Sequence, residues 1–152
     1  MPVQQDLAAL PTTKKLFLGS AVLLLVDSFL PWYHVSFGGV SVSEGGWHQF
    51  GSITWIVLIA LLVWEGVRIA GAAPIEGRRA DLFSSVGALA VVVLGVIFVL
   101  QRISDGSLGF GFFLGVILLV GLGYSAFQTF QASGGAEAVR HEVDERRKPP
   151  VV

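Results

Sequence analysis

The 152-residue sequence contains no cysteine and few charged residues. Without cysteine, the chain has no disulfide, no thiolate nucleophile and no thiolate metal site. Charged residues make up 14% of the chain and hydrophobic residues 53%, whereas soluble globular domains carry about 25% charged residues. The net charge is −1, so a nucleic-acid partner is not indicated. This composition favours a chain that is embedded in a lipid bilayer.

The sequence contains four long apolar stretches, and each is close to the length of a membrane-spanning helix. A helix needs about 20 mostly apolar residues to cross the hydrocarbon layer. We predict spans at about 14–32, 50–70, 83–101 and 108–130. The predicted fold class is therefore an all-α membrane protein, a four-transmembrane-helix bundle with a polar lead at 1–13 and a charged tail at 133–152.

The ten Lys and Arg residues are distributed unevenly around these stretches. Nine of them lie at the beginning of the first stretch, from the last turn of the second stretch to the beginning of the third, or after the fourth, and only Arg102 lies elsewhere. Cytoplasmic loops are enriched in Lys and Arg. We therefore predict a multi-pass protein of the cell membrane with both termini in the cytoplasm and with residues 31–50 and 102–109 outside. No cleavage pattern follows the first stretch, so we expect this span to be retained.

The outer connection after the first span has the pattern of a β-hairpin. Residues 34–43 alternate between apolar and polar on both sides of Gly38-Gly39, and a two-residue turn with positive φ favours Gly-Gly. One apolar face is then formed by Val35, Phe37, Val40 and Val42. An isolated hairpin is marginal in water, so we expect this face to rest on the helix ends or on the membrane surface.

Asp27 lies inside the first span, near its outer end. A carboxylate inside a span is costly and normally faces protein or water. One interpretation is a proton or cation site. The other, which we favour, is a structural partner for Arg102, the only basic residue on the outer side, at the matching end of the third span.

Glu65 lies near the cytoplasmic end of the second span, and Arg68 follows three residues later on the same helix face. We expect these two side chains to pair, or Glu65 to pair with arginines of the inner loop. Asp27 and Glu65 then lie in different leaflets, which is too far apart for two carboxylates that share a proton.

No recognised catalytic motif is present, so we predict a protein that is not an enzyme and has no cofactor. The outer-loop residues of metal-ligand type, in addition to Asp27, are His34, Glu44 and His48. Their spacing matches no recognised zinc pattern, so we predict no metal site.

Several aromatic residues and glycines are candidates for interactions. Trp32, Tyr33 and Trp47 flank the outer ends of the first two spans, where aromatic rings favour the headgroup layer. Gly111 and Gly115 form a Gly-x-x-x-Gly motif, which lets helix backbones approach closely. We favour packing inside the chain over dimerisation for this motif, and both remain open.

The segment Phe29-Leu30-Pro31-Trp32-Tyr33, followed by a Val-, Ser- and Gly-rich stretch and by Gly46-Trp47, resembles small four-span membrane proteins of actinobacteria. In that group a similar motif follows the first helix. The resemblance covers about residues 14–130 and implies a class of membrane protein without an assigned activity. The outer β-element also resembles claudin-like proteins, although the paired cysteines are missing here and the loop is shorter.

We expect a non-enzymatic accessory or scaffold subunit of a membrane assembly, with the lipid bilayer and other membrane chains as its partners. A homo-oligomer remains open. The alternative is a small oligomeric channel or transporter, in which Asp27 would lie at the pore mouth.

Overall fold

The computed structural model describes residues 10–48 and 50–147. Within them the chain forms α2 (Thr12–Asp27), β1 (Tyr33–Phe37), β2 (Val40–Glu44), α3 (Phe50–Ile69), α4 (Arg78–Asp105), α5 (Phe110–Ala132) and α6 (Gly135–Arg147). Most of the predicted polar lead and the last five residues of the predicted tail lie outside the described residues. The described part of that tail is largely helical, because it forms α6.

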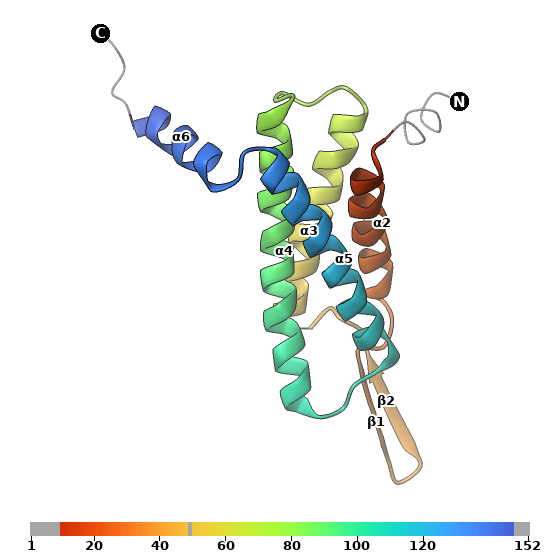
Figure 1. Ribbon diagram of the computed structural model, residues 1–152. Coiled ribbons are helices and arrows are strands. Elements are labelled where there is room, and N and C mark those ends of the chain that lie inside the picture. The colour runs from red at the N-terminus through yellow and green to blue at the C-terminus, as the bar shows by residue number, and fades with distance from the viewer. Residues whose placement is uncertain (1–9, 49, 148–152) are drawn as a thin grey trace.

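The helices α2 to α5 run alternately down and up as a bundle (Figure 1). α5 packs against both α2 and α4, and α3 packs against α4. The beginning of α2 and the end of α5 lie at one end of the bundle, and the hairpin projects from the opposite end (Figure 1). The buried core takes apolar side chains from all four of these helices, such as Leu24, Leu58, Val91 and Leu122.

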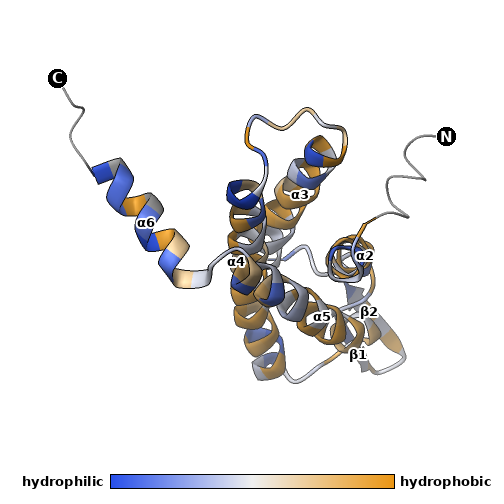
Figure 2. Cartoon of the chain, turned by 45° about the horizontal axis from the view of Figure 1, so that its top comes forward, coloured by the Kyte–Doolittle hydropathy of each residue, from blue (hydrophilic) through white to orange (hydrophobic). Residues whose placement is uncertain are grey.

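Three helices, α3, α4 and α5, are long and apolar enough to cross a membrane. They contain 20, 28 and 23 residues. Most of their visible length is apolar in Figure 2, and large aliphatic side chains such as Ile56, Val93, Ile117 and Val120 remain exposed. A helix that is apolar all round needs an apolar environment. The chain therefore has the architecture of a multi-pass membrane protein.

α2 is shorter than the predicted first span. It has 16 residues, or about 24 Å at 1.5 Å per residue, and it ends at Asp27 rather than near residue 32. The N–H of Ser28 still donates to the carbonyl of Leu24. Pro31 follows, and proline cannot continue a helix without losing a hydrogen bond. That α2 forms a fourth span remains a prediction.

The predicted hairpin is confirmed, including its register. β1 and β2 pair antiparallel with Phe37 opposite Val40. Gly38 and Gly39 have φ angles of +60° and +85°, which glycine adopts without steric cost. Phe37, Val40 and Val42 are exposed and Val35 is half-buried, so most of the apolar face does not rest on the helix ends. Contact of this face with the membrane surface remains a prediction.

Candidate functional site

Asp27, the last residue of α2, has a buried carboxylate. It is 1% exposed, and neither carboxylate oxygen has a hydrogen-bond partner among the described residues. Its backbone carbonyl accepts a hydrogen bond from Trp32 Nε1 at 3.0 Å. Burial of an unpaired polar group is costly, which makes Asp27 the first candidate for a functional role.

Trp32 is fully buried at the centre of an aromatic cluster at the hairpin end of the bundle. Its ring centroid lies 5.6 Å from that of Trp55, 5.1 Å from that of Phe98 and 6.2 Å from that of Phe112. Tilted and edge-to-face contacts of this kind are favourable. Trp32 was predicted to lie at the level of the headgroup layer, and that depth remains a prediction, but the bundle itself covers the whole side chain.

Gly111 and Gly115 of α5 form the surface on which Trp32 packs. A Cβ atom at Gly115 would overlap the benzo ring of Trp32 and would lie 2.7 Å from Asp27 Oδ2. A Cβ atom at Gly111 would lie 3.0 Å from Trp32 Cδ1, and the N–H of Gly111 donates to the carbonyl of Pro31 at 3.0 Å. The close approach that the glycine motif permits is therefore made within the chain.

The expected ion pair between Asp27 and Arg102 is not formed. Arg102 Nη1 lies instead 3.4 Å from Asp105 Oδ2, and the guanidinium lies 5.1 Å from the ring centroid of Phe98 and 5.9 Å from that of Tyr33. The prediction required the first and third helices to be neighbours, but α2 packs chiefly against α5. Arg102 therefore interacts with its own helix end and with aromatic rings.

At the opposite end of the bundle, Glu65 lies between two basic side chains. Its side chain has no exposed surface, and its Oε2 lies 2.6 Å from Lys14 Nζ. Its Oε1 lies 3.2 Å from Arg68 Nη1, which confirms the predicted pair. Lys14 was missed as a partner. Its position offered a signal, because the start of the first span and the end of the second lie at the same membrane face.

Arg68 extends this polar cluster to α4. Its Nη2 lies 2.6 Å from Asp81 Oδ1, and its Nη1 donates to Ser84 Oγ at 2.8 Å. Ser84 Oγ also accepts a hydrogen bond from Trp64 Nε1 at 3.0 Å. The charged members of the cluster are Lys14, Glu65, Arg68 and Asp81. Their formal charges cancel, so the cluster joins α2, α3 and α4 without a net charge.

The base of the hairpin is fixed to its neighbours. Trp47 Nε1 donates to Ser28 Oγ at 3.0 Å, and the N–H of Gly46 donates to the carbonyl of Ser28 at 2.9 Å. Tyr33 forms an antiparallel bridge with Leu108, in the connection between α4 and α5. These contacts hold the base, and the rest of the hairpin extends beyond the bundle (Figure 1).

The polar side chains of the hairpin interact with each other. His34 Nδ1 lies 2.8 Å from Ser43 Oγ across the two strands, and His48 Nε2 lies 3.7 Å from Glu44 Oε2. Among residues 10–48 and 50–147, no group of three or more His, Asp or Glu residues is arranged to hold a metal ion.

Comparisons of this chain with protein-family models, curated proteins and solved structures find no match. The function has therefore to be inferred from the geometry of the chain itself. Three features stand out: the buried carboxylate of Asp27, the polar cluster around Glu65, and the exposed apolar face of the hairpin.

Proposed function

We propose that this protein is a four-span protein of the cell membrane, with both termini in the cytoplasm, that acts as a non-enzymatic accessory or scaffold subunit. The length and composition of α3, α4 and α5 support three of the spans. α2 is short, but a short span is accommodated by local thinning of the bilayer. The concentration of Lys and Arg at the end opposite the hairpin supports the orientation.

The exposed apolar face of the hairpin supports a binding role. Phe37, Val40 and Val42 are 86%, 67% and 51% exposed, and they lie on one face of the paired strands. Contiguous apolar surface outside a membrane marks an interaction site. The free edge of a hairpin strand can also pair with a strand of another chain. Another membrane chain that covers this face would supply the packing that a lone hairpin lacks.

The interior of the bundle offers less support for chemistry or conduction. Glu65 is held in ion pairs, and aromatic rings around Trp32 fill the hairpin end. Asp27 is packed against α5 and has no hydrogen-bond partner among the described residues. A general base must lie within hydrogen-bond reach of the substrate proton that it abstracts, and the bundle covers the side chain of Asp27, which is 1% exposed.

Affinity purification of the full-length protein from membranes in mild detergent tests this role. Phe37→Ser together with Val40→Ser removes the two most exposed side chains of the apolar face, and Ser36→Ala together with Ser41→Ala is the matched control on the opposite face. The same identified chain should co-purify with the wild type and with the control. The amount of this chain that is recovered should fall by about tenfold with the Phe37→Ser, Val40→Ser variant. A tenfold weaker affinity corresponds to about 1.4 kcal/mol of binding free energy. Equal recovery in all three would contradict the proposal.

A small oligomeric channel or transporter is the second candidate, and the buried carboxylate of Asp27 favours it. A cation path needs charged or polar groups with access to water, so in a channel an oligomer would have to open a water path to Asp27, which is 1% exposed in the single chain. Proton or K⁺ flux into liposomes that contain only the purified protein separates the two functions. Flux no greater than in empty liposomes supports the accessory role. Flux that is present in the wild type and abolished by Asp27→Asn would contradict the accessory role and support a channel.

A further inference from the structure

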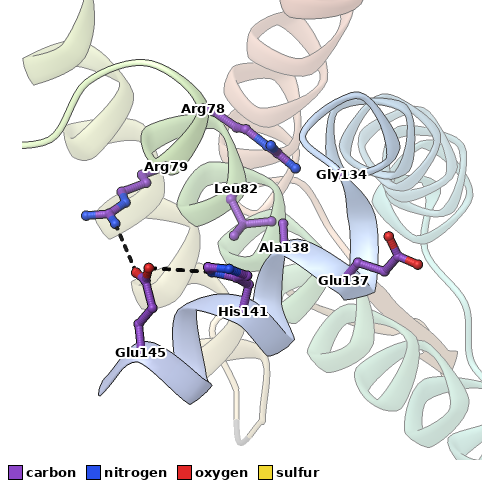
Figure 3. A pocket seen from close by; sticks show the side chains of 8 residues that line it. All are labelled: Arg78, Arg79, Leu82, Gly134, Glu137, Ala138, His141 and Glu145. Carbon is purple, nitrogen blue, oxygen red and sulfur yellow. Dashed lines mark ion pairs between the residues drawn. The ribbon is translucent and has the colours of Figure 1, made fainter. Parts of the chain in front are cut away.

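Two adjoining open cavities of different character lie between α6 and the beginning of α4. The first has a volume of about 480 Å³, and Arg78, Arg79 and His141 lie in its wall (Figure 3). The second has a volume of about 380 Å³ and is mostly apolar. Its apolar lining is Ile75, Leu82, Phe83, Val86, Val139 and Val143. Arg79 and Leu82 line both cavities, so a polar part and an apolar part meet in one groove.

The local sequence explains why α6 presents apolar side chains to this groove. Gly134 and Gly135 have φ angles of +95° and +56°, which allow the chain to turn sharply between α5 and α6. α6 therefore leaves the bundle to one side, beside α4 (Figures 1 and 2). Val139 and Val143 are four residues apart and share one face of the helix. That face lies opposite the exposed side chain of Phe83.

Two carboxylates, Glu137 and Glu145, line the polar part together with the basic side chains, and the Glu137 carboxylate points away from Arg79 and His141 (Figure 3). Glu145 lies between Arg79 and His141 (Figure 3), with its Oε2 3.5 Å from Arg79 Nη2 and its Oε1 3.7 Å from His141 Nδ1. Arg78 Nε donates to the carbonyl of Ser133 at 2.6 Å, which holds the guanidinium at the cavity wall. Glu145 and Arg79 are about half and two-thirds exposed, and exposed ion pairs of this kind are weak. A stronger anion can therefore displace Glu145.

We propose that this groove binds an anionic phospholipid, with the phosphate headgroup in the polar part and an acyl chain in the apolar part. Basic pockets beside membrane-spanning helices are suited to anionic headgroups, and arginine binds phosphate oxygens in a two-pronged geometry. The apolar part continues from this headgroup site along α4, a helix long enough to span the bilayer. An acyl chain there would cover Phe83 and Val86, which are otherwise exposed.

Native mass spectrometry of the full-length protein in detergent measures this binding. The probes are phosphatidylglycerol and phosphatidylcholine with the same acyl chains. Phosphatidylglycerol should be retained several-fold more strongly. Arg79→Gln and Val143→Glu should each weaken its binding about fivefold or more, because one removes a headgroup contact and the other places a charge in the acyl site. Arg140→Gln is the matched control, since it removes a positive charge from α6 outside both cavities.

Glu145→Gln is expected to strengthen lipid binding, whereas Arg79→Gln and Val143→Glu weaken it. It removes the carboxylate that competes with the headgroup, so binding of phosphatidylglycerol should become stronger, which misfolding would not produce. Equal retention of the two lipids would overturn the proposal, and so would an equal loss in Arg79→Gln and Arg140→Gln. Displacement of the lipid by an equal concentration of glycerol phosphate would also overturn it, because the ligand would then be a soluble phosphate.

Discussion

Gly115→Ala should destabilise the bundle, because the added methyl group has no space. It would overlap the ring of Trp32 and would lie 2.7 Å from Asp27 Oδ2. Trp32 cannot turn away easily, since it packs against Trp55 and Phe98 and its Nε1 donates to the carbonyl of Asp27. Overpacking of a filled core costs about 1–3 kcal/mol. We expect the free energy of unfolding to fall by that amount.

Unfolding of the purified protein in mixed micelles, followed by tryptophan fluorescence, measures this loss. Gly123→Ala is the matched control in the same helix, because its added methyl would lie 3.5 Å from the methyl groups of Val92, an ordinary contact. Alanine favours a helix over glycine by up to about 1 kcal/mol. The control should therefore leave the free energy of unfolding unchanged or slightly higher.

A second background isolates the contact with Trp32. Trp32→Phe removes the part of the ring that the Gly115→Ala methyl group would overlap, so Gly115→Ala should cost less free energy in that background. The reasoning would be refuted if Gly115→Ala were as stable as Gly123→Ala. It would also be refuted if the loss were the same with tryptophan or phenylalanine at position 32.

Glu65→Gln removes a buried carboxylate from contact with two basic side chains, so the free energy of unfolding should fall by about 3–5 kcal/mol. A loss below about 1 kcal/mol in the same micelle assay would contradict the role of the cluster. Asp27→Asn should leave stability unchanged or higher, because the carboxylate has no hydrogen-bond partner to lose within residues 10–48 and 50–147. Clear coupling to Arg102→Gln in a double-mutant cycle would show that the two residues pair after all. Single cysteines at Ser41 and Ala136, in a chain without native cysteine, test the orientation. On intact cells an impermeant reagent should label position 41 and not position 136, and the reverse pattern would contradict it.

The hairpin and the long helices could be predicted because their determinants are local. The register follows from alternation within ten residues around Gly38-Gly39, and the strands pair as that pattern requires. Three long apolar stretches correspond to α3, α4 and α5. The Glu65–Arg68 pair is also local, since three residues along a helix bring the two side chains together.

The remaining features depend on which helices are neighbours, and the sequence pattern does not contain that information. Asp27 and Arg102 were paired because the sequence places them at the same predicted depth in the membrane. However, α2 packs chiefly against α5 rather than against α4. Trp32 lies at the end of the first predicted span, which is a common position for a tryptophan at the membrane interface. The glycines of α5 nevertheless make room for its ring inside the bundle. The groove beside α6 could not be predicted, because it depends on the turn at Gly134 and Gly135.

Site-specific photocrosslinking in cells tests the proposed binding role most directly. Photoreactive residues at Val40 and at Ser41 occupy neighbouring positions on opposite faces of β2. We predict that position 40 crosslinks to one membrane chain and that position 41 crosslinks to it weakly or not at all. Equal crosslinking from both positions would contradict the proposal that the apolar face of the hairpin binds a partner, and so would the absence of any crosslink from position 40 in the membrane-inserted protein.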